Sequence, residues 1–391
     1  LHMLSARRIA AAVSARELSA EEVTRHHLDR IEEQGHLNTV ITVTRERALA
    51  RATQNPTGSL AGGPLLVKDV FATPGVRTTY GSGIFRDNVP PRTATSVLRL
   101  LAAGAIMLGK ANLHEFAWGV TSRNRAYGAV VNSARPDRIP GGSSGGNASA
   151  LAAGLCALGL GTDTGASIRL PAAACGVAGF KPAFGSVPAD GLWPLAPSFD
   201  HVGPLARSLD DCALAIGVLR GAALEDRDPA GLRVRRLEAP AVAATTEAFL
   251  AAAGLPAAPA LVRLHLAEAA EVHRELYAAN SDDYDDDLHA KLAVGFAVPP
   301  GERAELVGAL HAWRAACLQQ CEWDVLVSPV YPGDLPAADV PMSLELSDRM
   351  TAYTRPVNWL GWPSAVSADG VMHTGRDEAA VLAHARAWEW R

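Results

Sequence analysis

The segment from residue 140 to 182 limits the fold of this chain more than any other, because it is dominated by glycine, alanine and serine. It contains two glycine-rich loops, one with Ser143 and Ser144 and the other with Ser167. Glycine tolerates backbone conformations that other residues avoid, so both loops can turn tightly. Upstream, Lys68 ends an apolar run that is typical of a buried strand. One lysine and serines on two such loops would suit a serine hydrolase that needs no histidine.

Short apolar runs alternate with helical patterns along the chain, which is typical of a layered α/β fold. Near the start, Ser19 and Glu22 have the spacing of a helix capping box. We therefore expect an α/β fold with a central twisted sheet, mostly parallel or mixed, covered by helices on both faces. The patterns predict helices within 5–33 and over 95–104, 147–154, 303–320 and 377–390, and strands over 64–70, 105–108, 155–160 and 324–329.

No linker, internal repeat or long charge run divides the 391 residues. The hydrophobic content of 48% over this length is enough to bury a large core, so we expect a single domain over 1–391. The stretch 222–300 is rich in alanine and charge, which predicts surface helices packed on that core.

The formal net charge of −5 argues against direct nucleic-acid binding, because such proteins usually carry a basic patch or stripe. The densest basic cluster, 233–236, is short and is expected to be a solvated face. The acidic run 282–287 lacks the spacing of an EF-hand loop, and we expect no metal site.

The cellular compartment follows from the cysteines and from two missing signals. Five cysteines, an odd number, favour free thiols in a reducing compartment. No apolar run has the length of a transmembrane helix, and no cleavable signal pattern stands at the start. We therefore expect a cytoplasmic protein without membrane contact, and the sequence is compatible with a homodimer.

Lys68 has two interpretations. A serine hydroxyl is a weak nucleophile until a base removes its proton, and lysine is a base only when neutral. Burial lowers the lysine pKa, and the apolar residues before Lys68 would provide such a setting. Taken alone, the local sequence favours an exposed charge paired with Asp69, whereas the serine loops downstream favour the base.

The two loops, GGSSGG at 141–146 and GTDTGASIR at 161–169, resemble the signature loops of the amidase signature family. The 24 residues from Ser143 to Ser167 match the family spacing. Similarity is dense over about 60–215, the signature core, and weaker elsewhere. The matching segments are 62–82, 103–119, 132–146 and 194–211.

The resemblance implies the amidase signature fold and hydrolysis of a carbon–nitrogen amide bond through an acyl-enzyme. In this arrangement Ser167 is the nucleophile, Lys68 is the distal base, and Ser143, held on a cis peptide, relays protons between them. The relay also protonates the leaving nitrogen. No cofactor is implied, and the expected partner is a small-molecule amide. Residues 222–300 would form a variable, substrate-side region, and 361–378 looks abbreviated against the family pattern.

Backbone N–H groups of the second loop are implied to form an oxyanion hole. The loop residues are Thr164, Gly165, Ala166 and Ser167. The family usually has glycine at position 166. Alanine keeps the N–H but restricts positive φ and adds a methyl group, which bears on substrate size more than on catalysis.

Further residues are expected to support the site. Ser144 would hydrogen-bond the loop or the lysine, or cap the following helix. Asp163 and Arg169 would hold the second loop.

The substrate contacts are expected from aromatic and polar residues. Asn112, Phe116 and Trp118 lie in the segment that lines the site in the family, with core packing as the alternative for the aromatic pair. Trp118, together with Trp193, Trp359 and Trp362, hints at an apolar or aryl acyl group.

Two other kinds of nucleophile, a serine elbow and a cysteine, fit the sequence less well. Ser144 lies in a G-x-S-x-G pattern and would need a strand directly before it and a histidine, for which 201, 373 and 384 are available. The preceding segment 132–140 is not typical of a strand. Cys156 and Cys175 lie in apolar runs, where a buried thiol is inert.

Other functions on the same fold stay open. The chain could be the A-type subunit of a tRNA-dependent amidotransferase complex, with a partner chain contacting the RNA. Esters and carbamates could also react, because they pass through the same tetrahedral intermediate. An inactive scaffold is disfavoured, since Lys68, Ser143 and Ser167 are all present.

Overall fold

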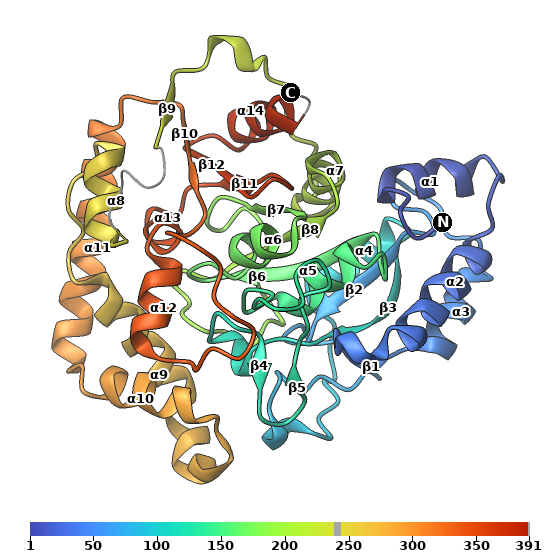
Figure 1. Ribbon diagram of the computed structural model, residues 1–391, viewed down its shortest axis with the longest axis horizontal. Helices are drawn as coiled ribbons and strands as arrows, with labels where there is room; N and C mark the ends of the chain where they lie inside the picture. The colour runs from blue at the N-terminus through green and yellow to red at the C-terminus, as the bar shows by residue number, and fades with distance from the viewer. Residues whose placement is uncertain (238–243, 390–391) are drawn as a thin grey trace.

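Ten short strands form one sheet within residues 1–237 and 244–389, the part of the chain that this computed structural model describes (Figure 1). The strand order is β1-β3-β2-β6-β8-β7-β11-β12-β10-β9. Strand β2 pairs in parallel with β3 and β6, β9 pairs in parallel with β10, and the other neighbours are antiparallel. The prediction of an α/β fold with a mixed sheet is confirmed. The strands are β1 (Val40–Val43), β2 (Pro64–Lys68), β3 (Ile106–Ala111), β6 (Leu158–Asp163), β7 (Ala178–Lys181), β8 (His201–Ala206), β9 (Val234–Arg236), β10 (Val325–Pro329), β11 (Ser364–Val366) and β12 (Val371–Gly375).

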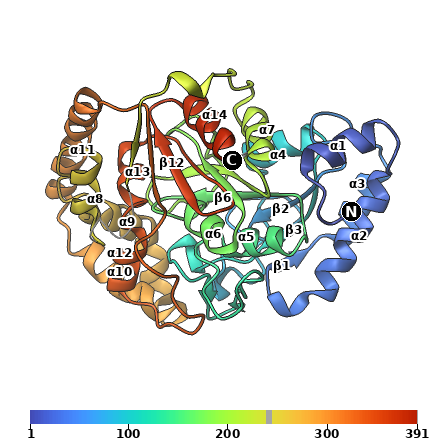
Figure 2. The same ribbon diagram turned by 45° about the horizontal axis from the view of Figure 1, so that its top comes forward.

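Helices cover both faces of this sheet because its strands are apolar on both sides. In β2, Leu66 packs into one core cluster and its neighbours Leu65 and Val67 pack into the other. Figure 2 shows α4, α7 and α14 on one side of the strands and α5 and α6 on the other. The helices are α1 (Ala6–Ser14), α2 (Ala20–Glu33), α3 (Arg45–Ala52), α4 (Thr95–Ala102), α5 (Gly145–Ala152), α6 (Arg169–Cys175), α7 (Leu209–Arg220), α8 (Thr246–Ala253), α9 (Leu261–Asn280), α10 (Asp286–Phe296), α11 (Pro300–Gln320), α12 (Leu344–Thr351), α13 (Arg355–Leu360) and α14 (Glu378–Glu389).

The expected elements near the loops occur with small shifts. The predicted cap is present, since Ser19 Oγ accepts the Glu22 N–H at 3.0 Å. The strand expected over 155–160 begins three residues later, at the start of β6. The reason is the end of α5, where Gly154 takes a positive φ of 69° and starts a turn before the chain extends. Residue 390, in the predicted last helix, lies outside the described residues.

Residues 222–300 contain the predicted helices and one strand that was not predicted. Helix α9 packs against α10 and α11, and α8 lies beside α11 at one edge of the molecule (Figure 1). The basic cluster 233–236 contains β9, an exposed strand at the end of the sheet, so its charged side chains are solvated as expected. None of the described helices combines the length and apolar character that crossing a membrane requires.

Candidate active site

Lys68 ends strand β2 and is fully buried. Its Nζ lies 2.7 Å from Ser143 Oγ and 2.7 Å from Thr162 Oγ1, on the neighbouring strand β6. Burial lowers the pKa of Lys68 to about 7, although the carboxylates of Asp163 and Asp200 act in the opposite direction. A large fraction of this lysine is therefore neutral near pH 7, as a base must be.

Asp69 is not the partner of Lys68. Its carboxylate accepts hydrogen bonds from Thr79 N at 2.8 Å and Thr79 Oγ1 at 2.6 Å, and it lies 3.5 Å from Lys110 Nζ. Both residues of the Asp69–Lys110 pair are fully buried. The alternative of an exposed Lys68–Asp69 pair is therefore wrong.

The loop that carries Ser143 is fixed by close backbone packing. The Gly142–Ser143 peptide is cis. Ser122 Oγ lies 2.8 Å from the carbonyl oxygen of Gly141 and 3.3 Å from that of Ser143. Only glycine fits at position 142, since a Cβ there would lie 2.5 Å from the Gly119 carbonyl oxygen. The sequence between the two glycine pairs thus presents Ser143 to Lys68.

Ser167 lies on the adjacent loop, between β6 and α6. The two loops are joined by the Ser144 N–H, which donates to the Ser167 carbonyl oxygen at 3.2 Å. Within the described residues, Ser167 Oγ forms no hydrogen bond, so the Ser143 to Ser167 contact is not made in this state. Catalytic hydrogen bonds are often long without substrate and tighten in the complex.

Asp163 holds the Ser167 loop in place. It accepts hydrogen bonds from Ile168 N at 3.0 Å, from Arg169 Nε at 3.0 Å and Nη2 at 2.9 Å, and from Asn358 Nδ2 at 2.9 Å. Burial would raise the pKa of Asp163, but Arg169, Lys181 and the Asn358 hydrogen bond together hold it below its usual range. The carboxylate therefore stays charged and fixes the loop.

Three residues of the predicted oxyanion loop border a cavity: Gly165, Ala166 and Ser167. Their N–H groups donate to no other group among the described residues, so they are free for an oxyanion. Thr164, the remaining residue of the predicted loop, does not line the cavity. Its Oγ1 donates to Asp200 Oδ1 at 2.6 Å, so it holds the loop.

The alanine at position 166 fits the loop without strain. Its φ is not positive, so the steric restriction on a Cβ does not apply. The residue is 2% exposed and packs with Ile168 and Leu170 in one core cluster.

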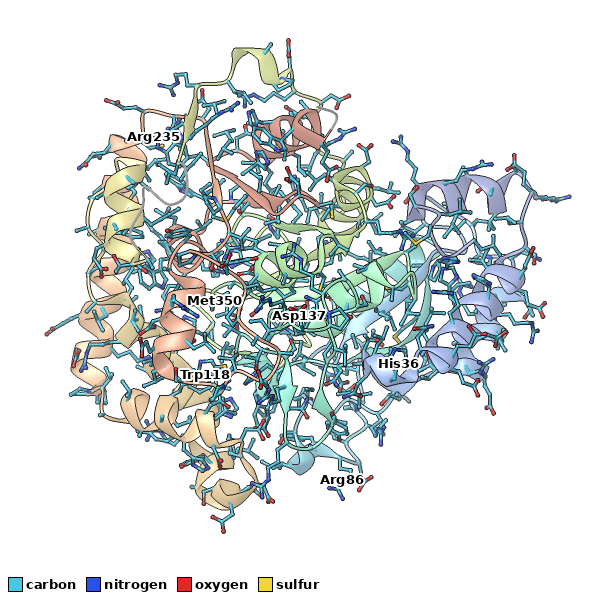
Figure 3. All side chains as sticks on the ribbon, in the orientation of Figure 1. His36, Arg86, Trp118, Asp137, Arg235 and Met350 are labelled. Carbon is cyan, nitrogen blue, oxygen red and sulfur yellow. The ribbon has the colours of Figure 1, made fainter. Side chains whose placement is uncertain are left out.

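The cavity beside Ser167 encloses about 270 Å³. Trp118 lines it, and Figure 3 shows this residue near the junction of α10 and α12. A separate hollow of about 500 Å³ lies between α7 and α14, away from the serines. The apolar wall of the first cavity includes Trp118, Val120, Leu195, Val262, Leu266, Val294 and Leu344, and its polar wall includes His265, Lys291, Ser347, Asp348, Thr351 and Arg355.

Two expected substrate contacts do not reach this cavity. Asn112 is fully buried, its Nδ2 donates to Asn38 O at 3.0 Å, and its Oδ1 accepts from Asn124 Nδ2 at 3.0 Å. Phe116 is fully buried in an aromatic cluster, with its ring centroid 5.3 Å from that of Tyr284. Both residues therefore pack inside the protein and do not line the cavity.

The other tryptophans also lie away from the cavity. Trp193 belongs to the aromatic cluster around Phe116, with ring centroids 5.5 Å apart. Trp359 and Trp362 are buried in the main core cluster. Of the four tryptophans, only Trp118 is on the cavity wall, so an aryl acyl group has less support than expected.

Ser144 starts α5 but its hydroxyl does not cap the helix. Its Oγ donates to the Thr162 carbonyl oxygen at 3.4 Å, so it supports the loop. It does not border the cavity, and no described strand directly precedes it, so the elbow arrangement is not formed. His201 Nδ1 instead contacts the Phe199 carbonyl oxygen at 2.6 Å, while His373 and His384 contact each other.

The cysteine alternative fails on burial. Burial raises the pKa of Cys156 to about 12 and that of Cys175 further, so both thiols stay protonated. Within the described residues no group of three or more histidine, cysteine or acidic side chains could hold a metal ion.

The acidic run 282–287 holds protein groups instead of a cation. Asp285 accepts the Arg125 N–H at 3.0 Å. Asp287 Oδ2 accepts from Lys291 Nζ at 2.6 Å and lies 3.3 Å from His114 Nε2. Lys291 in turn donates to the Trp118 carbonyl oxygen at 2.5 Å. The run therefore fastens α10 to the cavity wall.

Sequence reasoning missed several residues of the site. Thr162 directly precedes Asp163 on β6, but local sequence does not show that β6 lies beside β2, where the Thr162 hydroxyl meets Lys68. Asp200 lies in the matching segment 194–211, where its contact to the loop leaves no local signal. His265 and Arg355 come from distant helices, and no spacing rule connects them to the serines.

Comparisons with known proteins agree with this geometry. A family model described as Amidase matches residues 22–252. The A subunit of the glutamyl-tRNA(Gln) amidotransferase of Nitrosococcus oceani is 46% identical over 236 residues, which is 58% of this chain and 48% of the relative. The chain spans about half the length of the curated relatives it matches.

Two solved structures are similar over nearly the whole chain. One, an amidase, is 28% identical with a TM-score of 0.85, covering 99% of this chain and all of that one. Another is from a vestigial protein complex that bears on the origins of an s-triazine catabolic enzyme. It is 28% identical with a TM-score of 0.86, covering 99% of this chain and 98% of that one. The signature loops, the sheet and the family match together place this chain in the Amidase family, the amidase signature enzymes.

Proposed function

We propose that this chain hydrolyses a small-molecule amide through an acyl-enzyme on Ser167. The observation that carries the proposal is the fully buried Lys68, 2.7 Å from Ser143, beside a cavity that Ser167 borders. The cavity volume of about 270 Å³ lies near the lower end of ligand pockets, roughly 300–1,000 Å³, so the substrate is small.

The proton path runs through the three residues. Ser167 Oγ attacks the amide carbonyl carbon and gives its proton to Ser143 Oγ, which passes its own proton to neutral Lys68. When the carbon–nitrogen bond breaks, Lys68 returns the proton through Ser143 to the leaving nitrogen. Water then attacks the acyl-enzyme by the same path, and the carboxylic acid leaves.

The second loop would stabilise the negative charge on the carbonyl oxygen. Gly165, Ala166 and Ser167 offer N–H groups that no described residue uses. Donors that are fixed before the reaction need no rearrangement as charge develops, which makes this contribution large. Asp163 and Asp200 act as positioning residues, because they hold this loop from two sides.

A second function has support from the curated relatives, whose names describe the A subunit of a glutamyl-tRNA(Gln) amidotransferase. An amidotransferase subunit would break a carbon–nitrogen bond by the same chemistry as a hydrolase. The two would differ in the fate of the nitrogen, which an amidotransferase passes to an acceptor and a hydrolase releases as ammonia. The hydrolase has its own support in the solved amidase, which is similar over 99% of this chain. Esters and carbamates remain chemically competent substrates of the same site.

Labelling with a fluorophosphonate, followed by intact and peptide mass spectrometry, tests the nucleophile. We expect one adduct on Ser167, which Ser167→Ala abolishes and Ser144→Ala retains. An adduct on Ser144 would overturn the assignment. Ammonia release from simple amides by the isolated chain then separates the hydrolase from the amidotransferase subunit. A hydrolase would release ammonia alone, whereas a subunit that needs its complex would release little.

A further inference from the structure

Arg355, the first residue of α13, lines the cavity. A Cβ placed on Gly165 would lie 3.9 Å from Arg355 Cγ and 3.9 Å from His265 Cε1. Both side chains therefore flank the loop whose N–H groups face the cavity. A group attached to the carbonyl carbon of a bound amide would extend toward these residues.

The guanidinium of Arg355 is fixed by one of its nitrogens only. Nη2 donates to Asp348 Oδ1 at 2.8 Å, to Ser347 O at 3.5 Å and to Thr351 Oγ1. Nε and Nη1 donate to no described residue. The side chain is 10% exposed, so it is held in place with N–H groups left over. A planar guanidinium of this kind matches the two oxygens of a carboxylate.

The charges around Arg355 leave its part of the cavity wall positive. The Asp348 side chain is 64% exposed, so water screens its charge, whereas Arg355 is buried. Lys291 is already neutralised by Asp287 at 2.6 Å. Burial, with Arg355 and Lys291 nearby, lowers the pKa of His265 to about 3, so that ring stays neutral.

Another part of the cavity wall is apolar, with Val262, Leu266 and Val294 among its residues. A hydrocarbon linker fits this part, and an anion fits beside Arg355. We propose that the substrate is an amide whose acyl group carries a carboxylate, separated by a short apolar linker and bound by Arg355. The inference rests on the proposed hydrolysis at Ser167, and it makes Arg355 the residue that determines specificity.

Three amides of matched length test this inference: succinamate with a carboxylate, butyramide with a methyl group, and β-alaninamide with an ammonium. We expect kcat/KM for succinamate to exceed that for butyramide by at least tenfold and β-alaninamide to be the poorest. Arg355→Met should lower the succinamate-to-butyramide ratio by roughly 10- to 100-fold, the usual effect of losing hydrogen bonds to a charged group. Arg355→Lys should restore part of the ratio, because it keeps the charge but not the planar fork.

The matched control is Arg349→Met, which removes the same charge from exposed α12 surface outside the cavity. It should leave the ratio unchanged. An equal loss of ratio in both variants, or no loss in Arg355→Met, would overturn the inference.

A binding measurement separates this inference from the proposed function. Calorimetry of succinamate and butyramide binding to Ser167→Ala needs no turnover. Tighter succinamate binding that Arg355→Met removes supports the inference even if no amide is hydrolysed, which would refute only the proposed function. If ammonia is released but succinamate is preferred neither in rate nor in binding, the proposed carboxylate recognition by Arg355 is refuted. The proposed hydrolysis at Ser167 would stand.

Discussion

Replacing Lys68 by methionine should make the protein more stable while it removes the activity. Lys68 is fully buried, and burial lowers its pKa from 10.5 to about 7. One unit of pKa corresponds to about 1.4 kcal/mol, so keeping this lysine in the fold costs about 4 kcal/mol at pH 7. Methionine has a similar length and no charge, so it avoids that cost.

The gain is reduced by lost hydrogen bonds. Lys68 contacts Ser143 and Thr162, and each bond contributes about 1 kcal/mol, so the net gain at pH 7 is about 2 kcal/mol. The folded pKa lies below the unfolded one, so the unfolded state binds more protons between about pH 7 and 10.5. Wild-type stability therefore rises with pH across that window, and at pH 9 the cost of the lysine falls to about 2 kcal/mol.

Reversible urea unfolding of both proteins at pH 7 and pH 9 measures the difference. The advantage of Lys68→Met should shrink by about 2 kcal/mol between the two pH values. Ser167→Ala is the control, since it is also inactive but carries no such group. A variant that is less stable at pH 7, or an advantage that is independent of pH, would refute the buried neutral base.

Two further results follow from the same contacts. The wild-type kcat/KM, measured by ammonia release from pH 5 to 9, should fall about tenfold per pH unit below about 7 as Lys68 becomes charged, and a flat acid limb would exclude Lys68 as the base. Asp287→Asn should lower the free energy of unfolding by roughly 3 kcal/mol, because it leaves buried Lys291 without its counter-charge. The control Asp286→Asn, at an exposed position, should change the free energy of unfolding little. Equal effects of the two substitutions in urea unfolding would show that the Asp287–Lys291 pair does not stabilise the fold.

The helices and strands that the sequence predicts well are those marked by a continuous apolar run or a capping residue. The run before Lys68 is continuously apolar, which is typical of a strand buried on both faces. In the structure this strand, β2, lies between β3 and β6. The cap at Ser19 needs only three residues of spacing. By contrast, β9 pairs with β10 across about 90 residues, and its three side chains are exposed, so no apolar periodicity marks it.

The site divides in the same way. Glycine at 142 is required by contact with Gly119, so the loop around Ser143 has a sequence pattern that is readable without a structure. The neutral state of Lys68, in contrast, comes from burial in the sheet, and it is opposed by two carboxylates that are distant in sequence, Asp163 and Asp200. Local sequence favoured a charged pair with Asp69 because it could not show that Lys110, on β3, would take that partner.

Substrate choice is the part that local sequence describes least, and the fold explains why. The signature loops lie near the carboxyl ends of the interior strands β2 and β6, whereas the opposite cavity wall comes from α9, α10, α12 and α13, which follow them in the chain. Residues such as His265 and Arg355 can change there without disturbing the backbone contacts that fix Ser143 and Ser167. A carboxylate-binding arginine on that wall would thus alter which amide reacts and leave the chemistry of the serines unchanged. Variation of Arg355 and its neighbours is therefore the place to look for changes in specificity, and variation of the loops is the place to look for loss of activity.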